Sequence, residues 1–546
     1  MCRNSKKHIL IESSLENISR ICQYLGLILL FALAGCNSDF QQGWNAYENK
    51  NYTAALQKWQ PLAKNGDPRA QFYMGLMYEQ GQAVTQGQTQ AANWYKLSAE
   101  QGFSFAQNNL GMLYYNGEGL PKDSNEAEKW FKLAAKQDSS FALNNLGVMQ
   151  MRGQTLDKDS KKAEKMLKCS ARDGNVKARF ALGLMYRDGT GVSRNYREAA
   201  KWLRLAAQEG YAPAQNSLGL MYEQGQGVMQ VPDKAVQWYS KAAQQGNIEA
   251  QNNLGLMYME GKGVRQDYAQ AKKWFELAAE QGVANAQCCL GLMRLKGLGV
   301  PENYKEAAKW LNLAAERNSA VAQHTLGVIY YEGSGVVQDY KTSANWYSLA
   351  ANQGYAESQN NLALMYYEGA GVDQNYKEAV KWLRPAAQQE VAQAQYTLGW
   401  MYYKGYGVPQ DTEEASKWFR RAADKGFASA QTKLGLMYIK GQGVVKDYTK
   451  AADLFTLAAK QGDAFAQNKL AMCYEYGRGV KQDYVCAYIW YSVASSQGHK
   501  TSSQSRDIIA KSMTSLQIEQ AKQLAQVCLS EQNKKGMVDK QIAIAK

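Results

Sequence analysis

The chain has 546 residues, a formal net charge of +14 and 45% hydrophobic residues, which is enough apolar material for a large core. It contains only 8 prolines, a content that argues against long disordered linkers. The length would allow about three or four domains of ordinary size.

The first segment in chain order, residues 1–35, is predicted to be a signal peptide. A basic leader precedes an apolar run from Tyr24 to Ala34. At about 11 residues this run is too short to span a bilayer but is typical of a signal peptide. The run leads into LAGC, ending at Cys36, which resembles the lipobox of bacterial lipoproteins. The resemblance implies cleavage before Cys36 and lipid on its thiol, and Asn37 after it favours the outer over the inner membrane. An ordinary signal peptide that happens to contain a cysteine is the alternative.

The net positive charge indicates which classes of partner the protein could bind. An exported chain does not normally meet nucleic acid, so a basic surface indicates anionic lipid, cell-wall polymer or acidic proteins. The lysines and arginines are scattered and form no block. General solubility is therefore the alternative explanation of the charge.

Internal repeats dominate the rest of the chain. The motif L-G-x-M-Y, or a close variant, recurs with a period of 36 residues over about residues 67–498. Its small residue falls at Gly75, Gly111, Gly147, Gly183, Gly219, Gly255, Gly291, Gly327, Ala363, Gly399, Gly435 and Ala471. The chain is therefore predicted to be one array of twelve small units.

Each unit is predicted to contain two helices. In the unit from Asn247 to Gly282, the spacing of Ala250, Leu254 and Tyr258 places these side chains on one helical face. Glycine inside a helix costs about 1 kcal/mol relative to alanine, so its recurrence indicates that a neighbouring helix approaches closely. The second half has its own apolar face and ends at a glycine suited to a helix C-terminus.

The combined pattern A-x-x-x-L-G-x-M-Y, G-x-G-V, D-Y-x-x-A-x-x-W and A-A-x-x-G resembles the Sel-one-like repeats, relatives of the tetratricopeptide repeat. The resemblance implies an all-α, right-handed superhelical solenoid of about 13 antiparallel helix pairs, in which stacking buries the apolar faces. Residues 36–66 are expected to hold the lipidated cysteine and a divergent N-terminal hairpin. Residues 499–546 are expected to form C-terminal capping helices and a tail.

The loop GKGVRQDY, Gly261 to Tyr268, raises the question of a phosphate site. Such a loop needs a preceding strand, whereas here a helix precedes it, and the spacing does not fit G-x-G-x-x-G. Asp or Asn stands at the place of Asp267 in ten of the twelve units, which is typical of a helix N-cap. Gln270 completes a pattern close to a capping box. We therefore expect the loop to turn the chain.

The sequence offers little for catalysis. It has no H-E-x-x-H or S-x-x-K motif, and His324 is expected to be a surface variant. No cofactor or metal is predicted, and the protein is expected not to be an enzyme. Some Sel-one-like proteins carry a cysteine pair in every repeat and are associated with penicillin binding. The cysteines here follow no period, although Cys473 and Cys486 could meet where their helices join.

The predicted partner site lies on the concave surface, where solenoids bind. On a helical wheel the residues three before the repeat glycine lie opposite the core stripe, and amides there can hold an extended peptide by its main chain. Tyrosines four residues after the glycine could stack on apolar side chains or sugars. The predicted set is Asn108, Asn144, Asn216, Asn252, Asn360, Asn468, Tyr115, Tyr331, Tyr367 and Tyr403. The alternative is that the asparagines hydrogen-bond between neighbouring repeats and bind nothing.

These features predict a non-enzymatic scaffold of the bacterial cell envelope, held to the membrane only by its lipid anchor and facing the periplasm or the cell surface. The expected partners are other proteins or peptides, and no nucleic acid. Family resemblance suggests envelope assembly, control of cell-wall enzymes or host-cell entry. The alternative is a binder of cell-wall glycan, or a hydrolase of the β-lactamase-like branch of these repeats.

Overall fold

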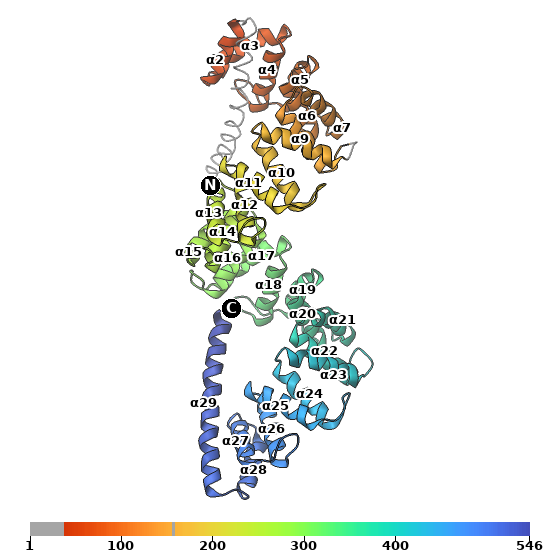
Figure 1. Cartoon of the computed structure of the whole chain (residues 1–546), viewed down its shortest axis with the longest axis vertical. Helices are drawn as coiled ribbons and strands as arrows, with labels where there is room; N and C mark the ends of the chain where they lie inside the picture. The colour runs from red at the N-terminus through yellow and green to blue at the C-terminus, as the bar shows by residue number, and fades with distance from the viewer. Residues whose placement is uncertain (1–37, 156–158, 546) are drawn as a thin grey trace. The chain divides into compact units, whose positions relative to one another are not determined.

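The computed structural model describes residues 38–155 and 159–545, and for residues 531–545 only the course of the backbone. The predicted signal peptide and Cys36 lie outside the described residues. The chain divides into two compact units, Met1–Ala286 and Gln287–Lys546. Between residues 38 and 545, outside the gap at 156–158, all regular secondary structure is α-helical (Figure 1).

The first unit contains fourteen complete described helices and the start of α16. Their bounds are α2 Ser38–Glu48, α3 Tyr52–Lys64, α4 Pro68–Gln80, α5 Gln88–Glu100, α6 Ser104–Asn116, α7 Ser124–Ala135, α8 Ser140–Met151, α9 Ser160–Arg172, α10 Val176–Asp188, α11 Tyr196–Gln208, α12 Ala212–Gln224, α13 Pro232–Gln244, α14 Ile248–Glu260 and α15 Tyr268–Glu280.

The second unit contains most of α16 and thirteen further helices. Their bounds are α16 Ala284–Lys296, α17 Tyr304–Glu316, α18 Ala320–Glu332, α19 Tyr340–Asn352, α20 Ala356–Glu368, α21 Tyr376–Gln388, α22 Ala392–Lys404, α23 Thr412–Asp424, α24 Ala428–Lys440, α25 Tyr448–Lys460, α26 Ala464–Tyr476, α27 Tyr484–Ser496, α28 Lys500–Ala510 and α29 Ser515–Ala545.

The helices pair as the sequence predicts. Helices α2 to α27 form thirteen consecutive pairs, of which α2–α3 is the divergent N-terminal hairpin. The even-numbered helices α4 to α26 are the first helices of the repeats, and the odd-numbered helices α5 to α27 are the second helices. The prediction of an all-α fold of paired repeats is confirmed.

The loop GKGVRQDY turns the chain between α14 and α15. Gly261 adopts the left-handed conformation with φ of 68° and donates its N–H to the Met257 carbonyl, which ends α14. Asp267 accepts hydrogen bonds from the N–H groups of Ala269 and Gln270, which starts α15. All ten Asp or Asn residues at this place accept such a bond in their repeats.

The second half of the predicted capping box does not form. The N–H of Asp267 donates to the Tyr258 carbonyl at 3.0 Å, so it needs no acceptor on the side chain of Gln270. Four of the five glutamates at the corresponding place pair instead with a lysine one turn further along, as Glu198 does with Lys201 at 3.4 Å, and Glu306 pairs with Arg294. The lysine pairs are exposed and contribute little to stability.

The second glycine of the loop joins neighbouring repeats. Gly263 also has a positive φ, of 69°, and a Cβ atom there would overlap the backbone of Pro232 and Asp233 at the start of α13. The loop therefore rests directly on the second helix of the preceding repeat. Corresponding glycines touch the preceding repeat in the same way, as Gly371 does at Tyr340.

The repeat glycine inside the first helix has the predicted packing role. A Cβ atom on Gly255 would lie 2.6 Å from the ring of Phe275, and one on Gly435 would lie 2.7 Å from the ring of Phe455. Real Cβ atoms do not approach so closely, so the absent side chain allows the bulky residue of the second helix to sit against the first helix.

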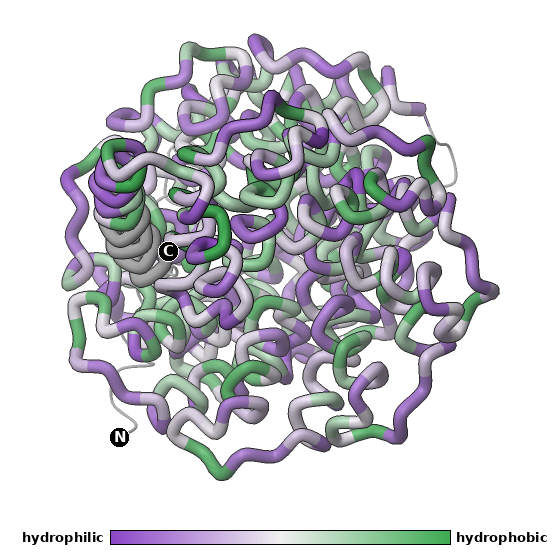
Figure 2. Tube along the Cα trace, turned by 90° about the horizontal axis from the view of Figure 1, so that it is seen from below, coloured by the Kyte–Doolittle hydropathy of each residue, from purple (hydrophilic) through white to green (hydrophobic). Residues whose placement is uncertain are grey.

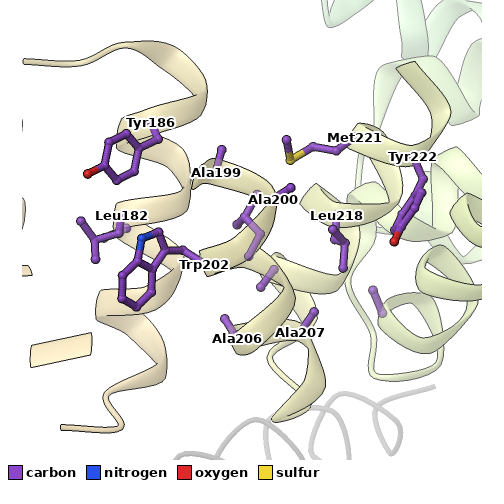
Figure 3. Close-up of a cluster of buried hydrophobic side chains, with 14 of the residues drawn as sticks. Leu182, Tyr186, Ala199, Ala200, Trp202, Ala206, Ala207, Leu218, Met221 and Tyr222 are labelled. Carbon is purple, nitrogen blue, oxygen red and sulfur yellow. The ribbon is translucent and has the colours of Figure 1, made fainter. Parts of the chain in front are cut away.

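The core runs between helices rather than at one centre. In the first unit, Leu182 and Tyr186 of α10, Trp202 of α11 and Leu218 of α12 are all buried in one cluster (Figure 3). Along the chain, hydrophobic and hydrophilic segments alternate without a long run of either (Figure 2). Each helix therefore contributes an apolar stripe, and stacking closes the core.

The array ends in two different caps. In the first unit Trp59 of α3 stacks on Tyr73 of α4 with ring centroids 4.6 Å apart. In the second unit Ile509 of α28 and Ala521 of α29 are buried in one cluster with residues of α27. Among the described residues, no helix is long and apolar enough to cross a membrane.

Candidate functional site

The predicted asparagines do not form an open face. Asn144, Asn252, Asn360 and Asn468 are buried, with 5–9% of their surface exposed, and Asn108 and Asn216 are half-buried. The helical wheel placed them opposite the core because it considers one helix alone. In the structure the first helix of the next repeat covers much of this side, so the expectation of an exposed column is wrong.

These amides hydrogen-bond along the array. Asn144 donates to Asn145 at 3.2 Å, Asn145 donates to Asn108 of the preceding repeat at 2.9 Å, and Asn108 donates to Asn109 at 3.3 Å. The chain therefore joins α8 to α6 through side chains alone.

A second chain of the same kind links three consecutive repeats of the first unit. Asn285 donates to Asn252 at 3.1 Å, Asn252 donates to Asn253 at 3.4 Å, and Asn253 donates to Asn216 at 3.1 Å. In the second unit Asn468 donates to Ser502 of the capping helix α28 at 2.9 Å. The amides thus act between repeats, as the alternative reading of the sequence expected.

The predicted tyrosines are also engaged within the protein. Tyr115 donates to Gln154 of the next repeat at 2.8 Å and accepts from Arg152 at 3.0 Å. Tyr331 meets Tyr340 edge to face, with ring centroids 5.1 Å apart. Each of these phenols is half-buried rather than free.

Tyr367 belongs to a small aromatic stack in the second unit. Its ring centroid lies 5.5 Å from that of Tyr376 and 6.4 Å from that of Tyr406, and the last two rings are stacked at 4.8 Å. Burial raises the pKa of Tyr367. One edge of the stack remains open, because Tyr406 is 36% exposed.

Tyr403 is the one predicted residue that lies in a charged cluster. Its ring stands nearly perpendicular to that of Trp400, at 84° and 5.4 Å. The Lys433 ammonium from α24 lies 3.5 Å from the centroid of Tyr403 and 4.1 Å from that of Trp400. Lys404 lies within 6.0 Å of both rings. Cation–π attraction thus holds Lys433 against α22.

The charge of this cluster is not balanced by carboxylates. Lys404, Lys433, Lys440 and Lys469 form no ion pair with any described residue, whereas Lys417, Lys425 and Lys450 nearby do. Burial, and then the charges of Lys404 and Lys440, lower the pKa of Lys433 to about 8. Burial and the charge of Lys440 also lower the pKa of Lys469.

Sequence reasoning missed a column of buried glutamines. Gln251 donates to the Ala243 carbonyl at 3.3 Å and accepts from Gln281 at 3.3 Å. The same two bonds recur in most repeats, for example at Gln431, Ala423 and Gln461. The signal was the glutamine four residues before the repeat glycine, which recurs with the same period.

Two of the repeats that depart from this ladder show how it changes. In one, Arg179 donates to the Ala171 carbonyl and pairs with Glu209, so a charged pair replaces the two glutamines. In the other, Lys425 stands where a glutamine is expected and pairs with Glu390 instead. The Oε1 atom of Gln395 is then buried without a hydrogen-bond donor among the described residues.

His324 is not the surface variant that the sequence suggested. Its Nδ1 lies 2.8 Å from the Ser358 hydroxyl, and its ring packs 4.9 Å from that of Tyr355. Burial lowers the pKa of His324, which favours the neutral imidazole. The residue therefore helps to join α18 to α20.

Cys473 and Cys486 are free thiols, so the pairing between them does not form. Burial raises the pKa of each of these two thiols to about 11, which makes them poor nucleophiles. Among residues 38–155 and 159–545, no group of three His, Cys, Asp or Glu side chains could hold a metal ion.

The lysine of the GKGVRQDY loop has a structural partner. Lys262 pairs with Glu223 of the preceding repeat at 3.0 Å, and Glu223 also accepts from the Tyr239 hydroxyl at 2.7 Å. Gln266 of the same loop donates to the Met259 carbonyl at 2.8 Å. Lys262 and Gln266 of this loop are thus bound within the protein.

Helix pairs that stack through capped turns, glycine contacts and amide ladders define an α-helical repeat solenoid of the tetratricopeptide-like class. The Sel1 repeat model matches twelve consecutive segments of the chain, namely 68–103, 104–139, 140–175, 176–211, 212–247, 248–283, 284–319, 320–355, 356–391, 392–427, 428–463 and 464–499. The chain belongs to the Sel1 repeat family.

One solved structure supports this assignment. A protective antigen present in uropathogenic Escherichia coli strains, which displays an SLR fold, is 34% identical, with a TM-score of 0.67, over 89% of this chain and 97% of its own. A Sel1 repeat protein from Oxalobacter formigenes is 33% identical, with a TM-score of 0.45, over 57% of this chain and 90% of its own. No curated protein matches the chain. The protein is thus a Sel1-repeat scaffold similar to a bacterial protective antigen.

Proposed function

We propose that this protein is a lipid-anchored, non-enzymatic scaffold of the bacterial cell envelope that binds other proteins along the first helices of its repeats. The observation that carries the proposal is the short distance from anchor to array. Helix α2 begins at Ser38, two residues after Cys36 in the sequence, and the repeats follow without an insertion. Lipid on Cys36 would hold the first helix pair at the membrane surface.

The proposal that the protein is not an enzyme rests on the chemistry of the candidate groups. His324 is buried against tyrosines and bonded to Ser358. Burial raises the pKa of the Cys288 thiol, which would favour its unreactive form. Neither residue has the activated partner that nucleophilic catalysis requires.

Export and the outer membrane are part of the same proposal. The support is the lipobox-like LAGC with Asn37 after it, and the relative described as a protective antigen. A protective antigen is a molecule that the immune system reaches, which suits an envelope protein. Envelope assembly, control of cell-wall enzymes and host-cell entry are the roles that such a scaffold could serve.

Two experiments test this function. Labelling of cells with an alkyne fatty acid should tag the wild-type protein and not a Cys36→Ala variant. A photo-crosslinking amino acid at Tyr476, exposed on a first helix, should yield protein adducts in intact cells, whereas one at Leu457, exposed on a second helix, should yield few.

The alternative function gives a different result. Retention of the purified protein by peptidoglycan, together with no protein adduct at Tyr476 in cells, would favour a cell-wall glycan binder. Turnover of a β-lactam by the purified protein would contradict the non-enzymatic assignment.

A further inference from the structure

Four lysines lie on three successive first helices of the second unit. Lys404 is on α22, Lys433 and Lys440 are on α24, and Lys469 is on α26. Lys404 and Lys440 occupy the same place in adjacent repeats, as do Lys433 and Lys469. Lys404 and Lys440 are exposed, and the other two are half-buried. We call these four residues the lysine cluster.

Aromatic rings keep the cluster in place. Lys433 lies over both Trp400 and Tyr403, and Lys469 lies 4.9 Å from the centroid of Phe465. The rings stabilise the ammonium groups of Lys404, Lys433 and Lys469 without neutralising them, because a ring quadrupole carries no net charge. The cluster therefore stays positive while its side chains are restrained.

In the first unit a lysine at the junction of two repeats is balanced by a carboxylate. Lys262 reaches Glu223 of the preceding repeat at 3.0 Å. The place of Glu223 is taken by Tyr403 on α22 and by Ile439 on α24, which offer no charge, whereas Glu475 holds it on α26 and accepts from the Tyr491 hydroxyl. Lys404, Lys433 and Lys440 therefore lack the carboxylate that Glu223 supplies to Lys262.

We propose that the lysine cluster binds an acidic peptide segment of a partner protein, extended across α22, α24 and α26. The proposal rests on the protein-binding function proposed above and names the chemistry of one partner site. Carboxylates of the peptide would pair with the four ammonium groups, and charge complementarity would orient it. Burial and then the charges of Lys404 and Lys440 lower the pKa of Lys433, and carboxylates of the bound peptide would offset the repulsion between these lysines.

The spacing of the cluster favours a particular acidic pattern. First helices of adjacent repeats lie about 10 Å apart, which is the usual distance between packed helices. An extended peptide advances about 3.3 Å per residue. An acidic side chain at every third residue would therefore meet successive repeats in register.

Exposed rings beside the cluster favour a peptide over a polyphosphate or an acidic glycan. Phe465 is 41% exposed and Tyr476 is 54% exposed. Apolar side chains between the carboxylates of a peptide could cover these rings, which removes apolar surface from water. An inorganic polyanion has no group that would do so.

The test uses the purified full-length mature chain and a fluorescent peptide with glutamate at every third position and leucine and serine between. We expect the wild type to bind it and the double variant Lys404→Gln, Lys433→Gln to bind at least about tenfold more weakly. The control variant Lys309→Gln, Lys377→Gln removes the same charge from exposed second-helix lysines and should bind within about twofold of wild type. Binding should weaken as salt increases.

A second peptide tests the register. It has the same composition with its glutamates grouped at one end, and we expect it to bind several-fold more weakly than the spaced peptide. Equal binding of both peptides, equal binding by K404Q/K433Q and wild type, or binding of inorganic polyphosphate but of neither peptide would each overturn the proposal.

The outcomes separate this inference from the proposed function. If K404Q/K433Q loses no protein adduct in intact cells, the lysine cluster is not the partner site, and the scaffold function stands. If the purified protein binds the spaced peptide but no protein adduct forms in cells, the scaffold function fails, and the lysine cluster remains a peptide-binding surface.

Discussion

The amide chains of the first unit and the lysine cluster of the second share one position of the repeat. Asn253 and Lys433 both stand two residues before the repeat glycine, yet Asn253 donates to Asn216 of the preceding repeat, whereas Lys433 lies over rings of the preceding repeat. An amide both donates and accepts, so a column of amides can bond to itself. An ammonium only donates, and a column of ammonium groups repels itself. The same repeat position can therefore hold neighbouring repeats together when it is an amide, or attract an anionic partner when it is a lysine.

The largest expected loss of stability comes from substituting the packing glycine that both regions contain. Gly255 lies against Phe275 beneath the amide chain, and Gly435 lies against Phe455 beneath the lysine cluster. Valine at either position would overpack the helix pair and should lower the free energy of unfolding by about 2–3 kcal/mol. Urea denaturation measures both losses. A loss in one region and none in the other would show that the regions do not share this contact.

Removing amides should destabilise the first unit. Asn253→Ala leaves the buried side of Asn216 without its donor, so we expect a loss of about 1–2 kcal/mol in the free energy of unfolding. The matched control is Asn116→Ala, since Asn116 is exposed and bonds only to Glu118. The control should change stability by less than about 0.5 kcal/mol.

The triple variant Asn216→Ala, Asn252→Ala, Asn360→Ala extends this test to the predicted site. We expect its thermal stability to fall while partner capture in cells persists. Loss of capture with unchanged stability would instead restore the asparagine site that the sequence predicted.

Removing a lysine of the cluster should change the free energy of unfolding in the opposite direction to removing an amide. The pKa of Lys433 is lowered from 10.5 to about 8, so between these values the unfolded chain holds a proton that the folded chain has released. The free energy of unfolding should therefore rise with pH across that window, and below about pH 8 the unfavourable charge is fully present. Lys433→Gln should stabilise the protein at pH 7 by up to about 1 kcal/mol after solvent screening, and flatten this rise. Thermal melts of both proteins from pH 7 to 10 measure it, and destabilisation by Lys433→Gln at pH 7 would contradict the contrast.

The smallest effect concerns the glutamine ladder. Lys425→Gln would supply the donor that the buried Oε1 of Gln395 lacks, at the loss of one exposed ion pair with Glu390. We expect a gain of about 0.5–1 kcal/mol in the free energy of unfolding. The double variant with Gln395→Ala should lose this gain, and an equal gain in both would show that the hydrogen bond is not its cause.

The turns and the packing glycines could be predicted from the sequence because their causes are local or strictly periodic. Gly261 ends one helix and Asp267 starts the next through contacts within a few residues, and the glycine column signalled close packing. The direction of the asparagine column could not be predicted, because a helical wheel contains no neighbouring repeat. The glutamine ladder left a signal in the sequence, namely the Ala-Gln pair that recurs in most repeats before the small residue.

The lysine cluster could not be predicted by comparing one repeat position across the repeats. Lys433 is held by Trp400 and Tyr403 from a different repeat, and neither residue is periodic in a way that marks the pair. Its significance also depends on the absence of a carboxylate at a position that holds Glu223 elsewhere. Only the packing of one repeat on the next brings these facts together.

Titration of the spaced acidic peptide into the wild type, Lys433→Gln and Asn253→Ala proteins tests most directly whether one repeat position serves two purposes. Lys433→Gln should lose peptide affinity and keep or gain thermal stability, whereas Asn253→Ala should lose thermal stability and keep peptide affinity at a temperature where it remains folded. The account is wrong if both variants lose affinity and stability together, or if neither loses affinity. In either case an amide at this repeat position would not serve stability alone while a lysine there serves binding.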